Sequence, residues 1–508
     1  MLTKLKSATS LGLKMVGIDI EVNVAKRGFP SFEIVGLPSK AVAESRERVK
    51  TALINSDFEF PNRKITINLA PADLPKEGSF YDVPIAVGLI CAITGLKVPK
   101  NVLFFGEISL DGKLRHTHGA FLLSLYAKEN KFESIFVPKD CANEAASIEG
   151  LNVFPVENLG QLYLHLSKTQ EISSYDTTKR DDKVYTPAPF SFADVIGQFQ
   201  AKRALEIAVA GGHNVLMTGT PGSGKTMLAK ALPSIMPNFS LEESIQVTKI
   251  YSLAGHIPPK GSLITTRQVR SPHHTTSYAG LIGGGSYPKP GEISLAHRGV
   301  LFLDEFPEFP RRVLESLRQP MEDGIVTIAR SSGTVTFPSR FILIAASNPC
   351  PCGYLSHPKI TCTCSDRQVT NYSKKISGPI LDRIDLHTEV SPVEVEELSL
   401  KYYKNNLTIS SEDVRNRVLN ARKIQEKRLK SEEIFVNGEM NNKIMSKFCE
   451  LSNDVESILV QAVRKFNLSA RSYFKVIKVA RTIADLEGSE LIKKEHVAEA
   501  LQYRRKRV

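Results

Sequence analysis

The stretch Gly219-Thr-Pro-Gly-Ser-Gly-Lys225-Thr226 decides the fold, because it has the form G-x-x-x-x-G-K-S/T of a phosphate-binding loop. A strand candidate at 214–217 precedes it, and a helical stretch at 227–232 follows it. In such a loop, backbone N–H groups turn toward the phosphates, and the helix N-terminus adds its positive end. Lys225 is expected to reach the β- and γ-phosphates of ATP, and Thr226 to ligate Mg²⁺. The predicted nucleotide-binding residues are Gly219, Thr220, Pro221, Gly222, Ser223, Gly224, Lys225 and Thr226.

A second apolar strand candidate ends in two carboxylates, in Val300-Leu-Phe-Leu-Asp304-Glu305. Short, fully apolar runs of this kind suit a parallel sheet that is covered on both faces. We expect Asp304 to hold Mg²⁺, directly or through its water, and Glu305 to orient and deprotonate the attacking water. A third run, 341–346, leads to Asn348, which would position that water; an ordinary strand-ending asparagine is the alternative.

Four of the seven cysteines form two Cys-x-Cys pairs, Cys350 with Cys352 and Cys362 with Cys364. Four thiolates so close in sequence would close a tetrahedral Zn²⁺ site. The Cys-x-Cys spacing is less diagnostic than Cys-x-x-Cys, so free thiols are the alternative, and His357 is a spare ligand candidate. Disulfides are not expected inside the cell.

Composition and periodicity divide the chain of 508 residues into four parts. Residues 1–167 alternate strand-like runs with helical stretches and predict a mixed α/β unit. Residues 168–189 are rich in Ser, Thr, Asp, Lys and Pro and predict a linker. Residues 190–392 contain the apolar strands, and 393–508 have helical spacing, with one helix expected across 443–466. The predicted fold class is α/β: a parallel sheet with helices on both faces, an N-terminal α/β unit and a C-terminal helical region.

Charge and hydropathy constrain the partners. The net charge of +12 permits a polyanion such as DNA, although a basic solvated surface explains it equally well. The sequence contains no run of about 18 apolar residues, which is the length needed to span a membrane. Residues 1–15 lack the apolar core of a secretory signal. We therefore expect a cytoplasmic protein without a membrane partner.

These motifs together resemble AAA+ ATPases of the magnesium-chelatase-like branch. The residues that carry this resemblance are 194–198, 211–214, the phosphate loop, 300–306 and 347–349. Other stretches are similar to the ComM/YifB family within that branch: His273-His274, Gly283-Gly-Gly285, Pro290-Gly-Glu-Ile-Ser-Leu-Ala-His297 and Asn348-Pro-Cys-Pro-Cys-Gly353. They occur together with an N-terminal domain of the Lon-protease type, so the resemblance covers essentially the whole chain.

The resemblance implies a homo-hexameric ring whose ATP sites lie between subunits. Arg383 matches the family's arginine finger, which would reach the neighbour's γ-phosphate; a local pair with Asp382 or Asp385 is the alternative. Arg471 matches the sensor-2 arginine of the helical domain, and a surface arginine is the alternative.

Alternating β-branched residues around a Ser-Ser-Gly turn predict a β-hairpin at 325–337. In the family branch this hairpin points into the ring pore, where Arg330 near its tip would track a DNA backbone. A hairpin that only packs a subunit interface is the alternative. The insert at 251–297, with Lys260, Arg267 and Arg270, is either a second pore element or a solvated loop.

The N-terminal domain departs from the Lon pattern at its catalytic positions. Phe80 stands where the family's nucleophilic serine falls, with Ser79 one place away, and 118–124 lacks the family's lysine. Nucleophilic catalysis needs both a hydroxyl and a base. We therefore expect no peptidase activity, and a role in assembly or substrate capture.

The resemblance implies an ATP-driven motor on single-stranded or branched DNA, namely a helicase or branch-migration factor of natural transformation. The alternative is a magnesium-chelatase-type ATPase that remodels a protein partner, although such subunits normally lack a Lon-type domain. A nucleotide switch without fast hydrolysis is disfavoured, because Glu305 and Arg383 are both present.

Overall fold

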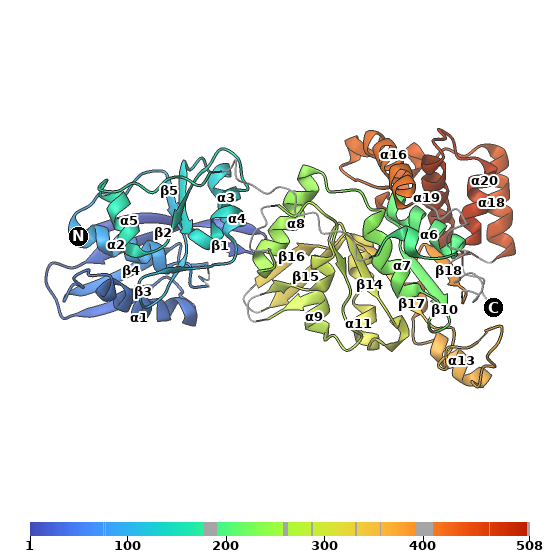
Figure 1. Cartoon of the computed structure of the whole chain (residues 1–508), viewed down its shortest axis with the longest axis horizontal. Helices are drawn as coiled ribbons and strands as arrows, with labels where there is room; N and C mark the ends of the chain where they lie inside the picture. The colour runs from blue at the N-terminus through green and yellow to red at the C-terminus, as the bar shows by residue number, and fades with distance from the viewer. Residues whose placement is uncertain are drawn as a thin grey trace.

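The computed structural model describes residues 1–74, 76, 78–176, 190–257, 263–285, 288–330, 333–355, 357–392, 410–466 and 468–504. Figure 1 shows an elongated molecule, with the N-terminal unit at one end, the phosphate-loop sheet in the middle and the C-terminal helices at the other end. Most of the predicted linker, 177–189, and the predicted start of the helical region, 393–409, lie outside the described residues.

The N-terminal unit contains two main sheets. The first has the order β1-β2-β4-β3 and comprises β1 (Leu2–Leu11), β2 (Lys14–Val24), β3 (Ser31–Val35) and β4 (Lys64–Ala70). The second is parallel and comprises β5 (Val102–Phe104), β8 (Ser134–Pro138) and β9 (Asn152–Val156), and a small ribbon joins β6 (Glu107–Ile108) to β7 (Leu114–Arg115). The helices are α1 (Lys40–Asn55), α2 (Asp82–Thr94), α3 (Ala120–Glu129), α4 (Ala142–Ala145) and α5 (Leu159–Leu166).

Helix α2 explains the most apolar run of the sequence. Its residues from Asp82 to Cys91 are all buried, so the run forms a helix inside the N-terminal core. Among the described residues, no helix has both the length and the apolar character needed to cross a bilayer.

The start of the predicted linker belongs to the N-terminal unit, because Ile172 is buried in its core and the N–H of Tyr175 donates to the carbonyl of Val153.

The central sheet is parallel throughout and has the order β11-β14-β17-β10-β18. Its strands are β10 (Val215–Gly219), β11 (Val269–Arg270), β14 (Val300–Leu303), β17 (Ile342–Ser347) and β18 (Leu386–Val390). Because the strands are parallel, the residues after β10, β14 and β17 meet at one edge, the carboxyl edge. The residues before β10 and β18 meet at the opposite edge, the amino edge.

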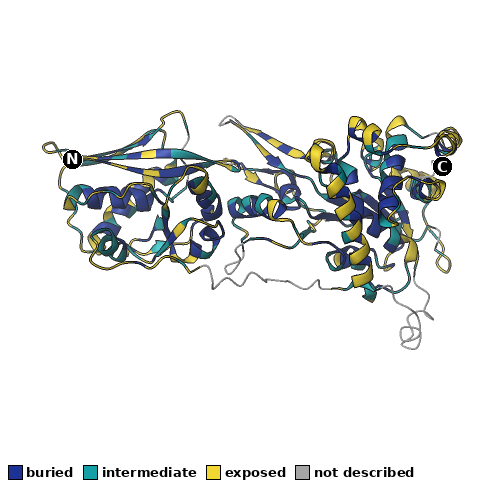
Figure 2. Cartoon of the chain, turned by 90° about the horizontal axis from the view of Figure 1, so that it is seen from above, coloured by how far each residue is buried: buried dark blue, intermediate teal, exposed yellow. Residues whose placement is uncertain are grey.

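Alternate residues of these strands enter two different cores, as expected for strands buried on both faces. Val215, Met217 and Phe302 face a core that includes α6 (Phe199–Gly211), α7 (Lys225–Ala231) and the C-terminal helices. Leu216 and Leu301 face a core that includes α9 (Tyr278–Ile282), α10 (Glu292–Leu295), α11 (Arg311–Glu315) and the hairpin of β15 (Ile325–Arg330) and β16 (Gly333–Pro338). Figure 2 shows buried residues where helices and strands face one another, and exposed residues on the outward sides.

The C-terminal region is helical and contains α16 (Ser411–Leu429), α17 (Asn442–Phe448), α18 (Asn453–Lys465), α19 (Ala470–Leu486) and α20 (Lys494–Gln502). The single helix predicted across 443–466 is wrong, because the chain breaks between α17 and α18. Cys449 leaves the helical conformation (φ −122°, ψ 57°), and Ser452 precedes the acidic first turn of α18 in an extended conformation. A serine followed by acidic residues is a start signal that restarts a helix within an otherwise periodic stretch.

Among the described residues, the contacts between the N-terminal unit and the central unit include the following two. The hydroxyl of Ser252 in α8 (Leu241–Ala254) donates to the buried carboxylate of Glu144. The turn between β1 and β2 lies against the β15–β16 hairpin, since a Cβ added at Gly12 would stand 2.7 Å from Cγ1 of Val335. The N-terminal unit therefore touches the hairpin for which the sequence predicts a pore position.

Candidate functional site

The phosphate loop has the backbone that its glycines predict. Gly222 and Gly224 adopt positive φ values of 75° and 94°, a region that residues with a Cβ rarely enter. The loop joins the carboxyl end of β10 to the N-terminus of α7, which starts at Lys225. Backbone N–H groups of this geometry form the anion-binding concavity that the motif requires.

Lys225, Thr226, Asp304 and Asn348 lie together at the carboxyl edge. Nζ of Lys225 donates to the carbonyls of Gly219 (2.7 Å) and Thr220 (2.8 Å), and it lies 3.3 Å from Oδ1 of Asn348. Oγ1 of Thr226 donates to Oδ2 of Asp304 at 2.6 Å. Burial lowers the pKa of Lys225, and the carboxylate of Asp304 opposes that shift.

These groups fit a nucleotide with its magnesium ion. A hydroxyl and a carboxylate are the hard oxygen ligands that Mg²⁺ prefers, and they already lie within hydrogen-bonding distance of one another. Nζ of Lys225 contacts carbonyl, hydroxyl and amide oxygens and, among the described residues, forms no ion pair with a carboxylate, so phosphate oxygens would be its strongest acceptors.

Glu305 projects from the same edge, next to a histidine for which the sequence analysis predicts no catalytic role. Glu305 has a positive φ of 50° and a side chain that is 55% exposed. Its Oε2 lies 3.1 Å from Nδ1 of His274, which stands in the insert after β11, the strand next to β14. An unfavourable φ at a carboxylate of this kind is typical of a functional position.

Arg383 and Arg471 lie together at the amino edge. The guanidinium of Arg383 contacts the carboxylate of Glu322 in α12 (Arg318–Asp323), and Nη2 of Arg471 lies 3.5 Å from the other oxygen of Glu322. The ion-pair partner of Arg383 among the described residues is thus Glu322 and not Asp382 or Asp385. Asp385 instead pairs with Lys475 of the helical region at 2.7 Å.

This arginine pair lies far from the phosphate loop of its own subunit. The side-chain amide of Asn214, directly before β10, donates to the carbonyl of Arg383, whereas the phosphate loop follows the other end of that strand. Since β10 has five residues, its ends are roughly 16 Å apart at about 3.3 Å per residue. No arginine side chain bridges that span, so neither arginine completes the site of its own chain.

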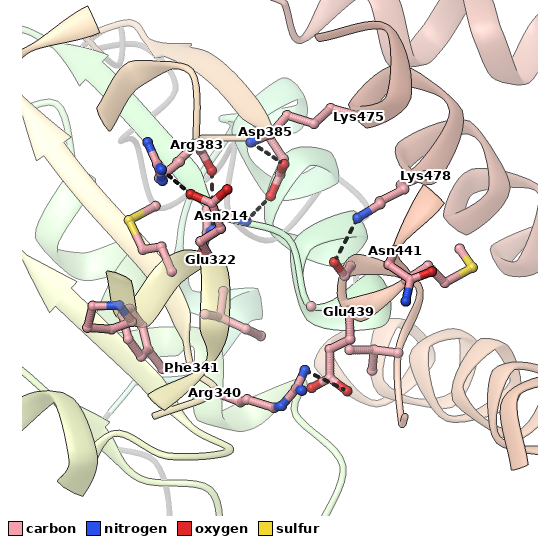
Figure 3. Close-up of a pocket in the computed structure, with 18 of the residues that line it drawn as sticks. Asn214, Glu322, Arg340, Phe341, Arg383, Asp385, Glu439, Asn441, Lys475 and Lys478 are labelled. Atoms are coloured by element: carbon pink, nitrogen blue, oxygen red, sulfur yellow. Dashed lines mark hydrogen bonds and ion pairs between the residues drawn. The ribbon is translucent and has the colours of Figure 1, made fainter. Parts of the chain in front are cut away.

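The arginines line a cavity of about 880 Å³ between the central sheet and the helical region. Figure 3 shows Arg383 directed toward Glu322 on the side of the sheet, with Lys475 and Lys478 approaching from α19. The lining includes nine basic and five acidic residues. They are Arg267, Arg298, Arg340, Arg383, Arg422, Lys443, Arg471, Lys475 and Lys478, and Glu243, Glu322, Asp382, Asp385 and Glu439.

The four cysteines predicted as zinc ligands converge in space. All four Sγ atoms lie within 4.8 Å of one another, and the Sγ–Sγ distances from Cys350 to Cys352 and to Cys362 are 3.3 Å and 3.7 Å. In a tetrahedral Zn²⁺ site with bonds of about 2.3 Å, neighbouring sulfurs are about 3.8 Å apart. Backbone N–H groups of Tyr354 and Thr363 lower the pKa of Cys352 to about 5.

The cluster is close to the phosphate loop. Gly353, next to Cys352, packs so tightly on Pro221 that an added Cβ would stand 2.6 Å from its ring. Cys350 follows Asn348 after one residue. His357 is not part of the group, and its Nδ1 accepts the N–H groups of Lys359 and Ile360.

The predicted hairpin forms, and Arg330 is the last residue of β15, paired with Gly333. Its side chain lies outside the described residues, so its role in DNA binding stays a prediction. Two basic residues of the insert are engaged in ion pairs, Arg267 with Glu243 at 2.6 Å and Arg270 with Glu292 at 2.7 Å. Whether the insert forms a second pore element stays a prediction.

In the N-terminal unit, Ser79 donates to the carboxylate of Glu107. Phe80, at the position of the Lon nucleophile, stacks on Phe105 with a centroid separation of 5.0 Å. The lack of peptidase activity stays a prediction.

Comparisons with known proteins match every part of the chain. Family models described as "Subunit ChlI of Mg-chelatase", "Magnesium chelatase, subunit ChlI" and "Magnesium chelatase, subunit ChlI C-terminal" match residues 20–141, 191–398 and 408–504. Competence protein ComM of Haemophilus influenzae is 40% identical over 98% of this chain and 96% of its own length. The uncharacterized protein YifB of Escherichia coli is 40% identical over 97% and 95%. The magnesium-chelatase 38 kDa subunit of Rhodobacter capsulatus is 25% identical over 32% and 50%.

Proposed function

The chain belongs to the ComM/YifB family of magnesium-chelatase-like AAA+ proteins, and we propose that it is an ATP-driven motor that acts on DNA. The proposed protein is a cytoplasmic homo-hexamer that binds ATP and Mg²⁺. It would move or unwind single-stranded or branched DNA and promote branch migration during natural transformation. In this proposal 1–167 is an inactive Lon-type domain, 190–392 is the ATPase core and 393–508 is the helical lid.

One observation carries the proposal: the two sets of catalytic groups occupy opposite edges of one sheet. At the carboxyl edge, Thr226 donates to Asp304, and Nζ of the neighbouring Lys225 lies 3.3 Å from Oδ1 of Asn348. Arg383 and Arg471 share Glu322 at the amino edge, beyond reach of their own phosphate loop. A site built this way becomes complete when the carboxyl edge of one subunit faces the amino edge of the next, which a closed head-to-tail ring provides.

The residues then divide the chemistry between two subunits. Lys225 and the loop N–H groups bind the phosphates, Thr226 and Asp304 hold Mg²⁺, and bound Mg²⁺ supplies charge neutralisation at the phosphates. Glu305 accepts a proton from the attacking water, which Asn348 orients. Arg383 and Arg471 of the neighbouring subunit stabilise the charge that develops in the transition state.

The assignment of DNA as substrate is supported by the hairpin and by the relative. The β15–β16 hairpin projects from the ATPase core, and the β1–β2 turn lies against it, so the N-terminal unit is placed to follow its movement. The net charge of +12 suits a polyanion. A relative that is 40% identical is named a competence protein, which supports a role in competence.

The four cysteines support a resident Zn²⁺ ion. Their sulfur separations of 3.3–3.7 Å are close to those of a tetrahedral site and far from the separation of about 2.05 Å in a disulfide. Metal analysis of the purified protein should find about one zinc per chain. Absence of zinc together with four titratable thiols in this segment would assign them as free thiols.

The experiment that tests the proposed function measures ATP turnover with and without forked DNA, strand displacement on that fork, and the mass of the protein with ATP. We expect turnover to rise with forked DNA, ATP-dependent displacement of the paired strand, and a mass of about six chains. An ATPase that responds to no DNA would contradict the motor and favour the alternative, a chelatase-type ATPase that remodels a protein partner. Similarity to a magnesium-chelatase subunit over 32% of the chain keeps that alternative open.

A further inference from the structure

Glu322 joins the two arginines that the proposed function assigns to the neighbour's ATP. It lies near the end of α12, directly before the hairpin strand β15, and its side chain is 51% exposed. One carboxylate oxygen accepts from Arg383, and the other lies 3.5 Å from Arg471. The sequence separates these residues widely, and no family motif quoted above contains Glu322.

A carboxylate between two guanidinium groups reduces their mutual repulsion and limits their rotamer freedom. Two arginines that are meant to meet the same triphosphate repel one another when that anion is absent. Long side chains also lose rotamer freedom when they are held in one pose. A shared carboxylate offsets the repulsion and restricts the rotamers, and the Arg383 contact holds the pKa of Glu322 below its ordinary value, so the charge persists at neutral pH.

Both arginines keep donors for a second anion while they contact Glu322. Arg383 is fixed twice, by Glu322 and by the carbonyl of Pro379 at 2.9 Å; its Nε has no partner among the described residues but is buried, and its side chain is 12% exposed, so it must turn outward to meet a second anion. Arg471 is 58% exposed and contacts the carboxylate through Nη2. A guanidinium has five N–H donors, so it can serve a carboxylate and a phosphate together.

We infer that Glu322 is the positioning residue of a two-arginine clamp, which presents Arg383 and Arg471 as one unit to the triphosphate held by the next subunit. The inference rests on the proposed function, since the clamp has a purpose only if ATP is bound between subunits. Glu322 stands on the element that leads into β15. If the two arginines move toward a phosphate, Glu322 moves with them, and the short connection between α12 and β15 would pass that movement to the hairpin.

The test compares Glu322→Gln, Glu322→Asp and Asp323→Asn. Asp323 is the matched control, because it is the next residue of α12 and no hydrogen bond or ion pair joins it to either arginine among the described residues. We expect Glu322→Gln to lower kcat about tenfold, with KM and the unfolding temperature little changed, because the phosphate loop is at the other edge. Glu322→Asp should recover part of the loss, and Asp323→Asn should behave as the unchanged protein.

A double variant separates this inference from the proposed function. If Glu322 acts through Arg383, then adding Glu322→Gln to Arg383→Ala should cost little beyond Arg383→Ala alone. Turnover of Glu322→Gln equal to that of the unchanged protein, while Arg383→Ala is inactive, would overturn the clamp and leave the shared ATP site intact. Full turnover of Arg383→Ala would instead overturn the proposed function itself.

Discussion

The two halves of the candidate ATP site lie at opposite edges of the central sheet and differ in the contacts that their side chains make. At the carboxyl edge, Lys225 contacts Asn348 and Thr226 contacts Asp304 within one subunit. At the amino edge, the arginines contact a carboxylate of their own chain. Under the proposed function, this difference means that a single subunit binds the nucleotide, whereas fast hydrolysis needs the arginines of a second subunit.

Removal of Arg383 should lower ATP turnover more than any other change proposed here. We expect Arg383→Ala to lower kcat about 10³-fold, because a trans arginine stabilises transition-state charge that nothing else at the carboxyl edge replaces. Binding of a fluorescent ATP analogue should be retained, since Lys225 is untouched. The control is Arg318→Ala, which removes an exposed arginine that pairs only with Glu315 among the described residues. Loss of nucleotide binding in Arg383→Ala would place this arginine in its own site.

Removal of the proposed base tests the carboxyl edge. Glu305→Gln should lower kcat at least about 10²-fold and leave ATP bound, because the amide cannot accept the proton. Glu308→Gln is a matched control, since Glu308 is a nearby exposed carboxylate that pairs with Lys375. Turnover of Glu305→Gln at the level of this control would remove Glu305 from the role of base.

Removal of the thiol cluster should have a smaller effect on the same edge. We expect the double variant Cys362→Ser, Cys364→Ser to lose its zinc and to turn over ATP about tenfold more slowly, because Gly353 supports Pro221 and Asn348 lies beside the cluster. Cys449→Ala is the control, since Cys449 is buried away from these four sulfurs. A zinc-free double variant with full turnover would make the metal irrelevant to catalysis.

Removal of the Glu305 partner should have the smallest effect. His274→Ala should lower kcat about two- to fivefold, because Glu305 loses the imidazole that fixes its position at 3.1 Å. His273→Ala is the comparison variant: the ring of His273 packs on that of His274 at a centroid separation of 4.1 Å and hydrogen-bonds Thr275, but among the described residues it makes no ion pair with Glu305. Equal rates for the two variants would show that the His274 contact does not position the base.

The sequence predicted the carboxyl edge well for a simple physical reason. The phosphate loop and the Asp304-Glu305 pair are contiguous motifs at strand ends. The apolar strands before them predict a parallel sheet covered on both faces, which the structure contains. Family resemblance pointed to Arg383 and Arg471, but it did not indicate that they share a carboxylate.

What the sequence could not predict depends on contacts between distant segments. Glu322 has no motif of its own, and the family stretch His273-His274 assigned His274 no role; the contacts of both residues appear only when α12 meets α19 and when the insert after β11 meets β14. The break between α17 and α18 was missed because apolar spacing continues on both sides of it, although Ser452 with Asp454 is a local start signal.

Subunit mixing tests the central claim, a shared ATP site, most directly. Lys225→Ala lacks the carboxyl-edge half and Arg383→Ala lacks the amino-edge half, so each variant alone should be inactive. In an equal mixture that exchanges subunits, about a quarter of the interfaces regain both halves, and we expect about that fraction of the normal ATP turnover. A mixture that stays as inactive as its components, although mass measurement shows mixed rings, would contradict the account.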